Sequence, residues 1–104
     1  KEDRWRAAAP MPAGSGAGGN ASGALGGQLY VFGGEYFDNG GRVRPEVWRY
    51  DSKADSWYAA TPMPTPRHGL GAVVIGDTIW LVGGARRPSG NDTSDVVERF
   101  SLIC

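Results

Sequence analysis

Short apolar segments, each four to seven residues long, alternate with glycine-rich or polar segments along the chain. None has the three-to-four-residue spacing of an amphipathic helix, and most are rich in β-branched and aromatic side chains, which favours strands. Gly76 and Asp77 separate two apolar runs, as the turn of a β-hairpin does. Strands are expected at residues 47–50, 57–60, 69–75, 78–84 and 96–102. The pattern therefore predicts an all-β fold of short antiparallel strands.

The sequence repeats itself with a period of about 50 residues. "WRAAAPMP" from Trp5 matches "WYAATPMP" from Trp57, and "GGQLYVFGG" from Gly26 matches "GDTIWLVGG" from Gly76. "VWRYD" from Val47 likewise matches "VERFS" from Val97. The offset is 52 residues at the tryptophans and 50 at the glycines. A period of this length is typical of β-propeller blades rather than of helical solenoids.

Residues of each unit resemble the kelch repeat, whose pattern is a double glycine after an apolar strand, a Tyr and a Trp, and a proline-rich exit. One unit has Gly33, Gly34, Tyr50, Trp57 and "PMP"; a second has Gly83, Gly84 and Phe100; Trp5 with "PMP" matches the end of a unit. The resemblance implies a galactose oxidase-like β-propeller built from four-stranded antiparallel blades. About two blades are expected in this chain. Two departures are that Phe100 replaces Tyr and that residues 17–25 have few large apolar side chains where a first strand is expected.

The repeat predicts how the chain is divided. Residues 1–12 are expected to form the outer strand and exit of a preceding kelch unit. Residues 13–64 are expected to form the first blade, and residues 65–104 the second blade without its last strand. The chain is thus interpreted as a fragment of a larger propeller or as a self-assembling unit. In either case, Trp57 is expected to pack between blades.

Composition limits the partners and the chemistry. Eleven Lys and Arg balance eleven Asp and Glu, which argues against nucleic acid or an anionic membrane surface as the partner. Cys104 is the single cysteine and His68 the single histidine, so no metal site and no cofactor is predicted. No catalytic pair stands out, which favours a non-catalytic chain. The resemblance leaves an alternative open, in which a secreted or periplasmic propeller binds or modifies carbohydrate.

Loop lengths indicate which end of the blades binds a partner. The connections expected at residues 35–45 and 85–95, and the segments at 9–19 and 61–69, are all long and fall on one face of a four-stranded meander. The turns on the opposite face are short. Because function concentrates on such loops above a rigid scaffold, the long-loop face is the expected binding surface.

Candidate contact residues lie on that face. The resemblance makes Arg67 the first of them, because kelch adaptors hold acidic peptides with arginines at this kind of position; the alternative is a structural Arg that bonds loop carbonyls. The other candidates are His68, Arg42, Arg44, Arg86, Arg87 and Tyr36. His68 is more typical of a loop hydrogen-bonding group. Tyr36 and Phe37 are expected either to tuck onto the neighbouring blade or to contact a ligand.

Two functions follow. The first is a non-catalytic interaction scaffold that binds a protein or acidic peptide. The alternative is a carbohydrate-binding or carbohydrate-modifying propeller. Further partners are other blades of a longer chain, or a second copy of this chain.

Overall fold

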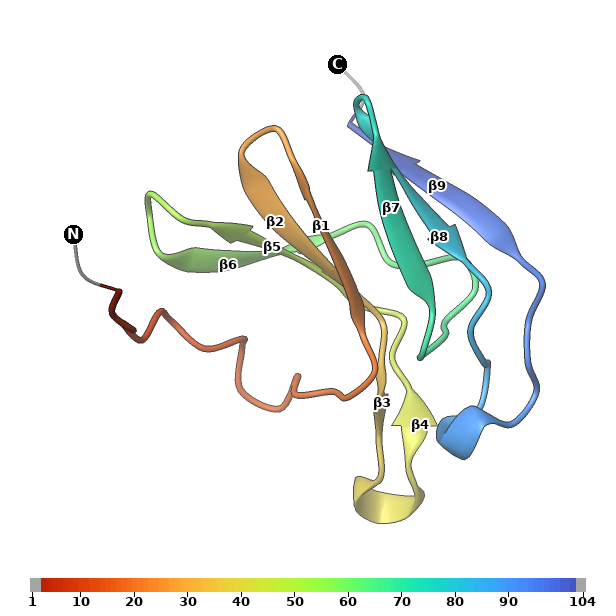
Figure 1. Ribbon diagram of the computed structural model, residues 1–104. Helices are drawn as coiled ribbons and strands as arrows, with labels where there is room; N and C mark the ends of the chain where they lie inside the picture. The colour runs from red at the N-terminus through yellow and green to blue at the C-terminus, as the bar shows by residue number, and fades with distance from the viewer. Residues whose placement is uncertain (1–2, 103–104) are drawn as a thin grey trace.

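The computed structural model describes residues 3–102, which form two antiparallel sheets packed face to face (Figure 1). The first sheet has the strand order β1 (Ala21–Leu25), β2 (Gln28–Phe32), β5 (Val47–Asp51) and β6 (Ser56–Ala60). The second has the order β7 (Gly71–Ile75), β8 (Thr78–Val82) and β9 (Val97–Ser101). A small hairpin of β3 (Glu35–Tyr36) and β4 (Arg42–Val43) lies between β2 and β5. The only helical turns in residues 3–102 are the 3₁₀ turns η1 (Asp38–Gly40) and η2 (Pro88–Gly90).

The expected antiparallel pairing and its turns are confirmed. Gly26 and Gly27 join β1 to β2 with φ of +59° and +77°, as a two-residue turn between twisted strands requires. In the turn between β5 and β6, the Asp51 carboxylate accepts hydrogen bonds from the amides of Lys53 at 3.0 Å and Ala54 at 3.2 Å. β1 forms although it has few large side chains, because Ala21 and Leu25 are buried. No helix within residues 3–102 has the length and apolarity to cross a bilayer.

The core lies between the two sheets. Tyr30 and Phe32 of β2 point across the interface and meet the ring of Phe100, at centroid distances of 5.1 Å and 5.5 Å. Phe32 and Ile79 are fully buried there. All of Tyr30, Val31 and Phe32 are buried, as expected of a strand covered on both faces. In β8, however, the outer residue Val82 is 48% exposed, so that strand is covered on one face only.

The double glycines after β2 and β8 let the backbone lie close to residues 67–70, which lead into β7. Gly33 has φ of +62°, and a side chain there would clash with the carbonyl oxygen of Arg67. The amide of Gly34 donates a hydrogen bond to that same carbonyl at 2.9 Å. Gly84 has φ of +89°, and a Cβ there would lie 2.7 Å from the carbonyl oxygen of His68. Glycine is therefore needed for both backbone angle and close approach.

The structure differs from the sequence-based expectation at two tryptophans. Trp57 does not lie between the two sheets. Its ring packs against that of Tyr50 on the outer face of the first sheet, with 4.9 Å between the centroids and 46° between the planes, and its indole N–H donates to the carbonyl of Ala9 at 2.8 Å. Residues 5–8 form no strand, and the side chain of Trp5 is fully exposed. The physical reason is that Ala9 bonds to the side chains of Asp55 and Trp57, which holds the residues before it beside the first sheet and away from the open edge of β9.

Candidate binding surface

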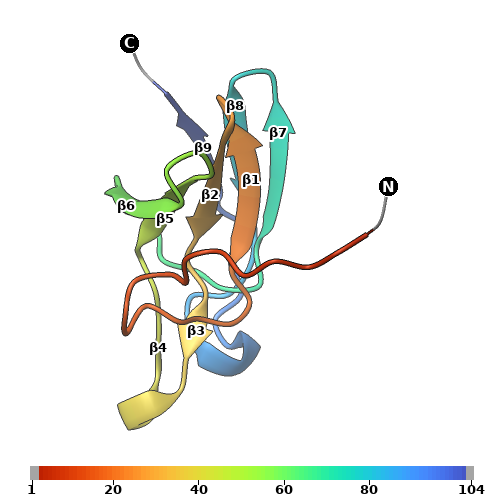
Figure 2. The ribbon, with the colours of Figure 1, turned by 90° about the vertical axis from the view of Figure 1, so that its left-hand side faces the viewer.

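Both long connections project from the same end of the molecule, as the loop lengths predicted. The β3–β4 hairpin with η1 and the loop containing η2 lie side by side in both views (Figures 1 and 2). The short β1–β2 and β7–β8 turns lie at the opposite end (Figure 1). We call the end formed by residues 33–46, 61–70 and 83–96 the loop face.

Arg67 lies inside the fold rather than on the surface. Its side chain has no exposed area, and one guanidinium nitrogen lies 2.9 Å from the carboxylate of Glu98. The others donate to the carbonyls of Thr65 at 3.2 Å, Gly83 at 2.9 Å and Val96 at 3.0 Å. Four of the five N–H donors of an Arg are thus engaged. This geometry supports the structural alternative for Arg67 and leaves it no access to a ligand.

His68 is also buried and connects the β3–β4 hairpin to the η2 loop. Its Nδ1 lies 3.2 Å from the Glu35 carboxylate, whose other oxygen accepts a hydrogen bond from the amide of Ser89 at 3.0 Å. Its Nε2 lies 2.9 Å from the carbonyl of Arg87 and 3.3 Å from the amide of Gly90. A neutral ring with its proton on Nδ1 accepts from Gly90, whereas a doubly protonated ring donates to Arg87. His68 therefore positions the loop that carries Arg87.

Arg44 and Tyr36 brace the β3–β4 hairpin. The Arg44 guanidinium lies 4.2 Å from the centre of the Tyr36 ring and donates to the carbonyls of Gly14 at 2.8 Å and Gly16 at 3.2 Å. Tyr36 is half-buried by this contact. Phe37, the next residue, is 61% exposed. The aromatic pair is thus divided, with one ring tucked against the fold and the other facing solvent.

The remaining candidate arginines stand around one open groove on the loop face. Arg42, Arg86 and Arg87 are exposed, and they line a groove of about 400 Å³ between the β3–β4 hairpin and the η2 loop. The rest of the groove is formed by Gly41, Val43, Pro45, Pro66 and Pro88. The carboxylate of Asp92 lies 3.5 Å from Arg86 and 4.0 Å from Arg87. We call this groove, with its three exposed arginines, the basic groove.

Sequence reasoning grouped the loop arginines correctly on one face but missed their carboxylate partners. Glu98 occupies a strand position whose counterpart in the first unit is Trp48, so the repeat gave no signal for it. A Glu within an apolar strand is a signal in itself, because such a residue is rarely buried unless it is paired. Asp92 follows two arginines within one loop, which is a weaker signal of the same kind.

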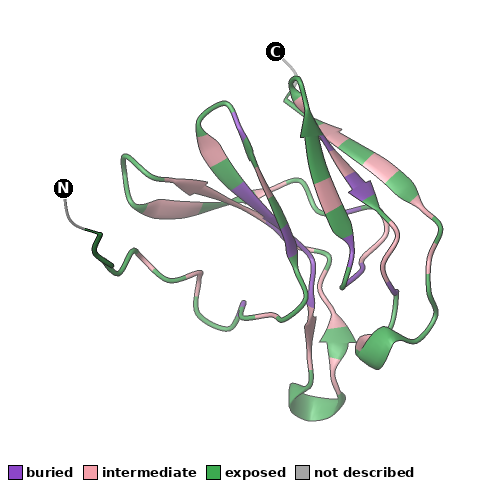
Figure 3. Ribbon diagram, in the orientation of Figure 1, coloured by how far each residue is buried: buried purple, intermediate pink, exposed green. Residues whose placement is uncertain are grey.

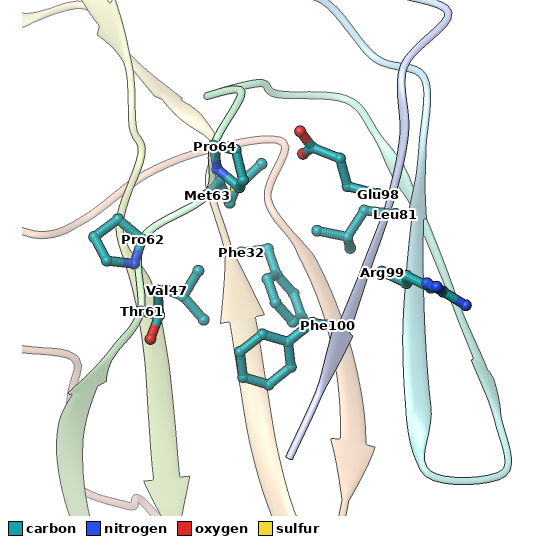
Figure 4. A pocket seen from close by; sticks show the side chains of 10 residues that line it. All are labelled: Phe32, Val47, Thr61, Pro62, Met63, Pro64, Leu81, Glu98, Arg99 and Phe100. Atoms are coloured by element: carbon teal, nitrogen blue, oxygen red, sulfur yellow. The ribbon is translucent and has the colours of Figure 1, made fainter. Parts of the chain in front are cut away.

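An apolar cavity of about 170 Å³ lies between the two sheets, beside β9. Phe32, Val47, Met63, Leu81 and Phe100 provide its apolar wall (Figure 4). Within residues 3–102 no group of three or more His, Cys, Asp or Glu side chains is placed to hold a metal ion.

Comparisons with known proteins agree with this architecture. The kelch motif family matches residues 17–64, which contain the first sheet. Beta-scruin of Limulus polyphemus is 35% identical over 69 residues, which is 66% of this chain and 7% of that protein. Human (Homo sapiens) Kelch-like protein 25 is 38% identical over 61 residues, covering 59% of this chain and 10% of that protein.

A solved structure shows the same fold. The structure of YjhT superposes with a TM-score of 0.76 and 28% sequence identity, over 84% of this chain and 26% of that one. The chain thus spans a tenth or less of the length of the scruin and Kelch-like relatives it matches, and about a quarter of the solved chain. The chain is therefore built of kelch repeats and forms about two blades of a kelch-type β-propeller.

Proposed function

We propose that this chain is a non-catalytic interaction scaffold whose basic groove binds an acidic peptide segment of a partner protein. A β-propeller fold serves many functions, so the fold alone does not decide between them. The proposal rests on the exposed arginines of the loop face. The family is consistent with it, since kelch propellers typically act as protein-interaction scaffolds.

The observation that carries the proposal is the convergence of Arg42, Arg86 and Arg87 on one groove. Arg67 and Arg44 are occupied by contacts within the fold, whereas these three have exposed guanidinium groups. A guanidinium donates two parallel hydrogen bonds to a carboxylate, which suits Asp and Glu side chains of a peptide. Pro45, Pro66 and Pro88 give the groove rigid apolar walls for the rest of an extended chain.

The ion pairs that Asp92 makes with Arg86 and Arg87 can be replaced by pairs with a ligand carboxylate. Its carboxylate faces both Arg86 and Arg87 at distances of 3.5 Å and 4.0 Å, and all three side chains are substantially exposed. Exposed ion pairs of this kind contribute only about 0.2–1 kcal/mol. An incoming carboxylate can therefore replace Asp92 at small cost. Asp92 would compete with the ligand and lower its affinity.

The carbohydrate alternative rests on a different residue. Phe37 is 61% exposed near the tip of the β3–β4 hairpin, and an exposed aromatic ring can stack on a sugar. An acidic peptide depends on the arginines, whereas a neutral sugar would depend on Phe37. The two functions are therefore separable by ligand and by variant.

The test is a calorimetric titration of a glutamate-rich peptide into the chain. Substituting both Arg86→Ala and Arg87→Ala should weaken binding roughly 2- to 30-fold, from about 0.2–1 kcal/mol for each exposed pair. Lys53→Ala is the matched control, because it removes one positive charge from a turn at the opposite end. Asp92→Asn should tighten binding. If the double variant binds as well as the native chain, or if only a neutral oligosaccharide binds and Phe37→Ala abolishes it, the proposal is wrong.

A further inference from the structure

We propose that His68 controls the position of Arg87 in the basic groove through its own protonation. When the ring carries two protons it holds the backbone of Arg87 in place, and when the ring is neutral it releases that backbone. The inference concerns the regulation of the groove and therefore rests on the proposed function. The contacts that carry it join β3, the segment before β7 and the η2 loop.

The backbone of His68 is fixed, whereas the loop that its ring faces lies at the surface. The amide of His68 donates to the carbonyl of Ala85 at 3.0 Å, and its carbonyl accepts from the amide of Ala85 at 2.9 Å. Figure 3 shows buried residues in the chain that leads into β7 and exposed residues in the η2 turn. A change at the ring is therefore relieved by movement of the loop rather than of His68.

Each ring nitrogen of His68 faces a hydrogen-bond acceptor. Nδ1 lies 3.2 Å from the Glu35 carboxylate, and Nε2 lies 2.9 Å from the carbonyl oxygen of Arg87. A neutral imidazole has one N–H and one lone pair, so either neutral tautomer turns a lone pair toward one of these oxygens. The doubly protonated ring donates at both contacts. The position of the Arg87 carbonyl is thus the one that a charged ring holds.

A neutral ring finds a different partner in the same loop. The amide of Gly90 lies 3.3 Å from Nε2, and a ring with its proton on Nδ1 accepts a hydrogen bond from it. That ring still donates to Glu35, but its Nε2 lone pair repels the carbonyl of Arg87. Loss of one proton therefore exchanges the bond to Arg87 for the bond to Gly90 and moves the loop relative to His68.

The η2 loop depends on contacts with its neighbours for its conformation. Ser89 and Asp92 have φ of +64° and +59°, in the left-handed region that residues with a side chain disfavour. The amide of Ser89 donates to the Glu35 carboxylate at 3.0 Å, and the other oxygen of that carboxylate faces His68. One carboxylate thus connects the loop to the ring. When the bond between Arg87 and the ring is lost, this strained loop is held by fewer contacts and shifts.

Glu35 is the charged group that faces the ring in the described part of the chain. It comes from β3, whereas the segment before β1 contributes the backbone of Gly19, at which a Cβ would lie 3.5 Å from Nδ1. The other charged side chains of these elements form ion pairs of their own, with Glu98 or within the loop: Arg67, Arg86, Arg87 and Asp92. The charge of Glu35 is therefore matched by a positive charge on the ring when the ring is doubly protonated.

Arg87 connects the ring to the groove. Its carbonyl meets His68, its amide donates to the carbonyl of Asn91 at 3.2 Å, and its exposed side chain lines the basic groove. Histidine is the side chain that ordinarily changes charge between pH 5 and 8. The groove should therefore present Arg42, Arg86 and Arg87 together toward the acid end of this range, and lose the alignment of Arg87 toward the other end.

Nuclear magnetic resonance of the complete chain without ligand tests the movement of the loop. His68 is the single histidine, so its ring signals report one site between pH 5 and 8. The amide shifts of Arg87, Ser89 and Gly90 should follow the titration of the ring, and Nε2 should be the nitrogen that loses its proton. In His68→Gln these amides should stay constant over the same range. A ring that keeps its charge state over this range, amides that do not follow it, or loss of the proton from Nδ1 would each overturn the proposal.

Calorimetric titration of a glutamate-rich peptide at pH 5.5 and at pH 8 tests the effect on binding. Glutamate side chains stay ionised at both values, so the charge of the peptide is nearly the same. The native chain should bind about 1.5- to 5-fold more weakly at pH 8, which is the contribution of one exposed ion pair. Arg87→Ala and His68→Gln should each remove this difference.

Arg42→Ala is the matched control, because it removes an arginine of the same groove that lies on β4 rather than on the η2 loop. It should weaken binding at both pH values by the same factor and keep the difference. A difference that persists in Arg87→Ala would show that His68 does not act through Arg87, and the proposal would be wrong. If the loop amides follow the ring but no peptide binds at either pH, the proposed function is wrong, and the regulation with it. If the native chain binds the peptide equally at both pH values, the proposed function stands and the regulation by His68 is wrong.

Discussion

The guanidinium of Arg67 and the carboxylate of Glu98 meet at 2.9 Å across the second sheet, and the Arg67 side chain has no exposed area. Arg67 lies just before β7, and Glu98 lies in β9, so the pair ties the start of the second sheet to its last strand. The carbonyl of Arg67 also accepts the amide of Gly34 from the first sheet. One residue thus links both sheets.

Removing this link should destabilise the chain strongly. Arg67→Ala leaves the Glu98 carboxylate and the carbonyls of Gly83 and Val96 without their donor, and breaking a buried pair from one side typically costs about 3–5 kcal/mol. We expect a fall of this size in the free energy of unfolding, measured by urea denaturation at one fixed protein concentration. Arg99→Ala, an exposed Arg of the same sheet, is the control. Equal stability of the two variants would show that Arg67 is not the structural link.

Gly33 should tolerate no side chain. Gly33→Ala places a Cβ against the carbonyl of Arg67 at a φ of +62°, whereas Gly27→Ala, with φ of +77°, meets no atom within 4 Å. Both variants carry the strain of a left-handed backbone, but only Gly33→Ala adds overpacking, which costs about 1–3 kcal/mol. The difference between their unfolding free energies should therefore be of this size. Two equally destabilised variants would contradict the close approach of the sheets at Gly33.

The hydrogen bond between the Ala9 amide and the Asp55 carboxylate should depend on pH. The hydrogen bond from the Tyr50 hydroxyl, and after it the one from the Ala9 amide, hold the pKa of Asp55 below its usual value. The same bond to Asp55, with smaller contributions from burial and the Asp55 charge, raises the pKa of Tyr50 above its usual value.

These two pKa shifts define a pH window for the hydrogen bond between Ala9 and Asp55. A lowered carboxyl pKa contributes stability above the unfolded value, near pH 4, and this is lost as pH falls through the lower folded value. A raised phenol pKa contributes stability that is lost as pH rises above about 10. The chemical shift of the Ala9 amide should therefore be constant between these limits and change in acid. In Asp55→Asn the acid change should vanish; if it persists, Asp55 is not the group responsible.

The 50-residue repeat predicted most of the fold. The double glycines, the apolar runs before them and the turn residues are local signals, and the strands appear where those signals placed them. Trp57 and residues 5–8 were harder, because their environment depends on a neighbouring blade. A sequence match states which role a residue has in a complete ring, and within residues 3–102 no further blade stands beside Trp57 or residues 5–8 to give them that role.

The candidate site was predicted less well than the fold. Loop lengths placed Arg42, Arg86 and Arg87 correctly on one face. Sequence alone could not show that Arg67 turns inward, because this depends on Glu98, which lies 31 residues away and has no counterpart in the first unit. Burial of a charged residue is decided by its partner, and a partner from a distant strand is invisible to local pattern.

The most direct test of the basic groove is a nuclear magnetic resonance titration of the chain with a glutamate-rich peptide. The amide shifts of Arg42, Arg86, Arg87 and Asp92 should move together along one binding curve and return as salt is added, because the contacts are exposed ion pairs. The amides of Gly27 and Ser52, in turns away from the loop face, should stay constant. Shifts confined to those turns, or no shift at the arginines, would contradict the account.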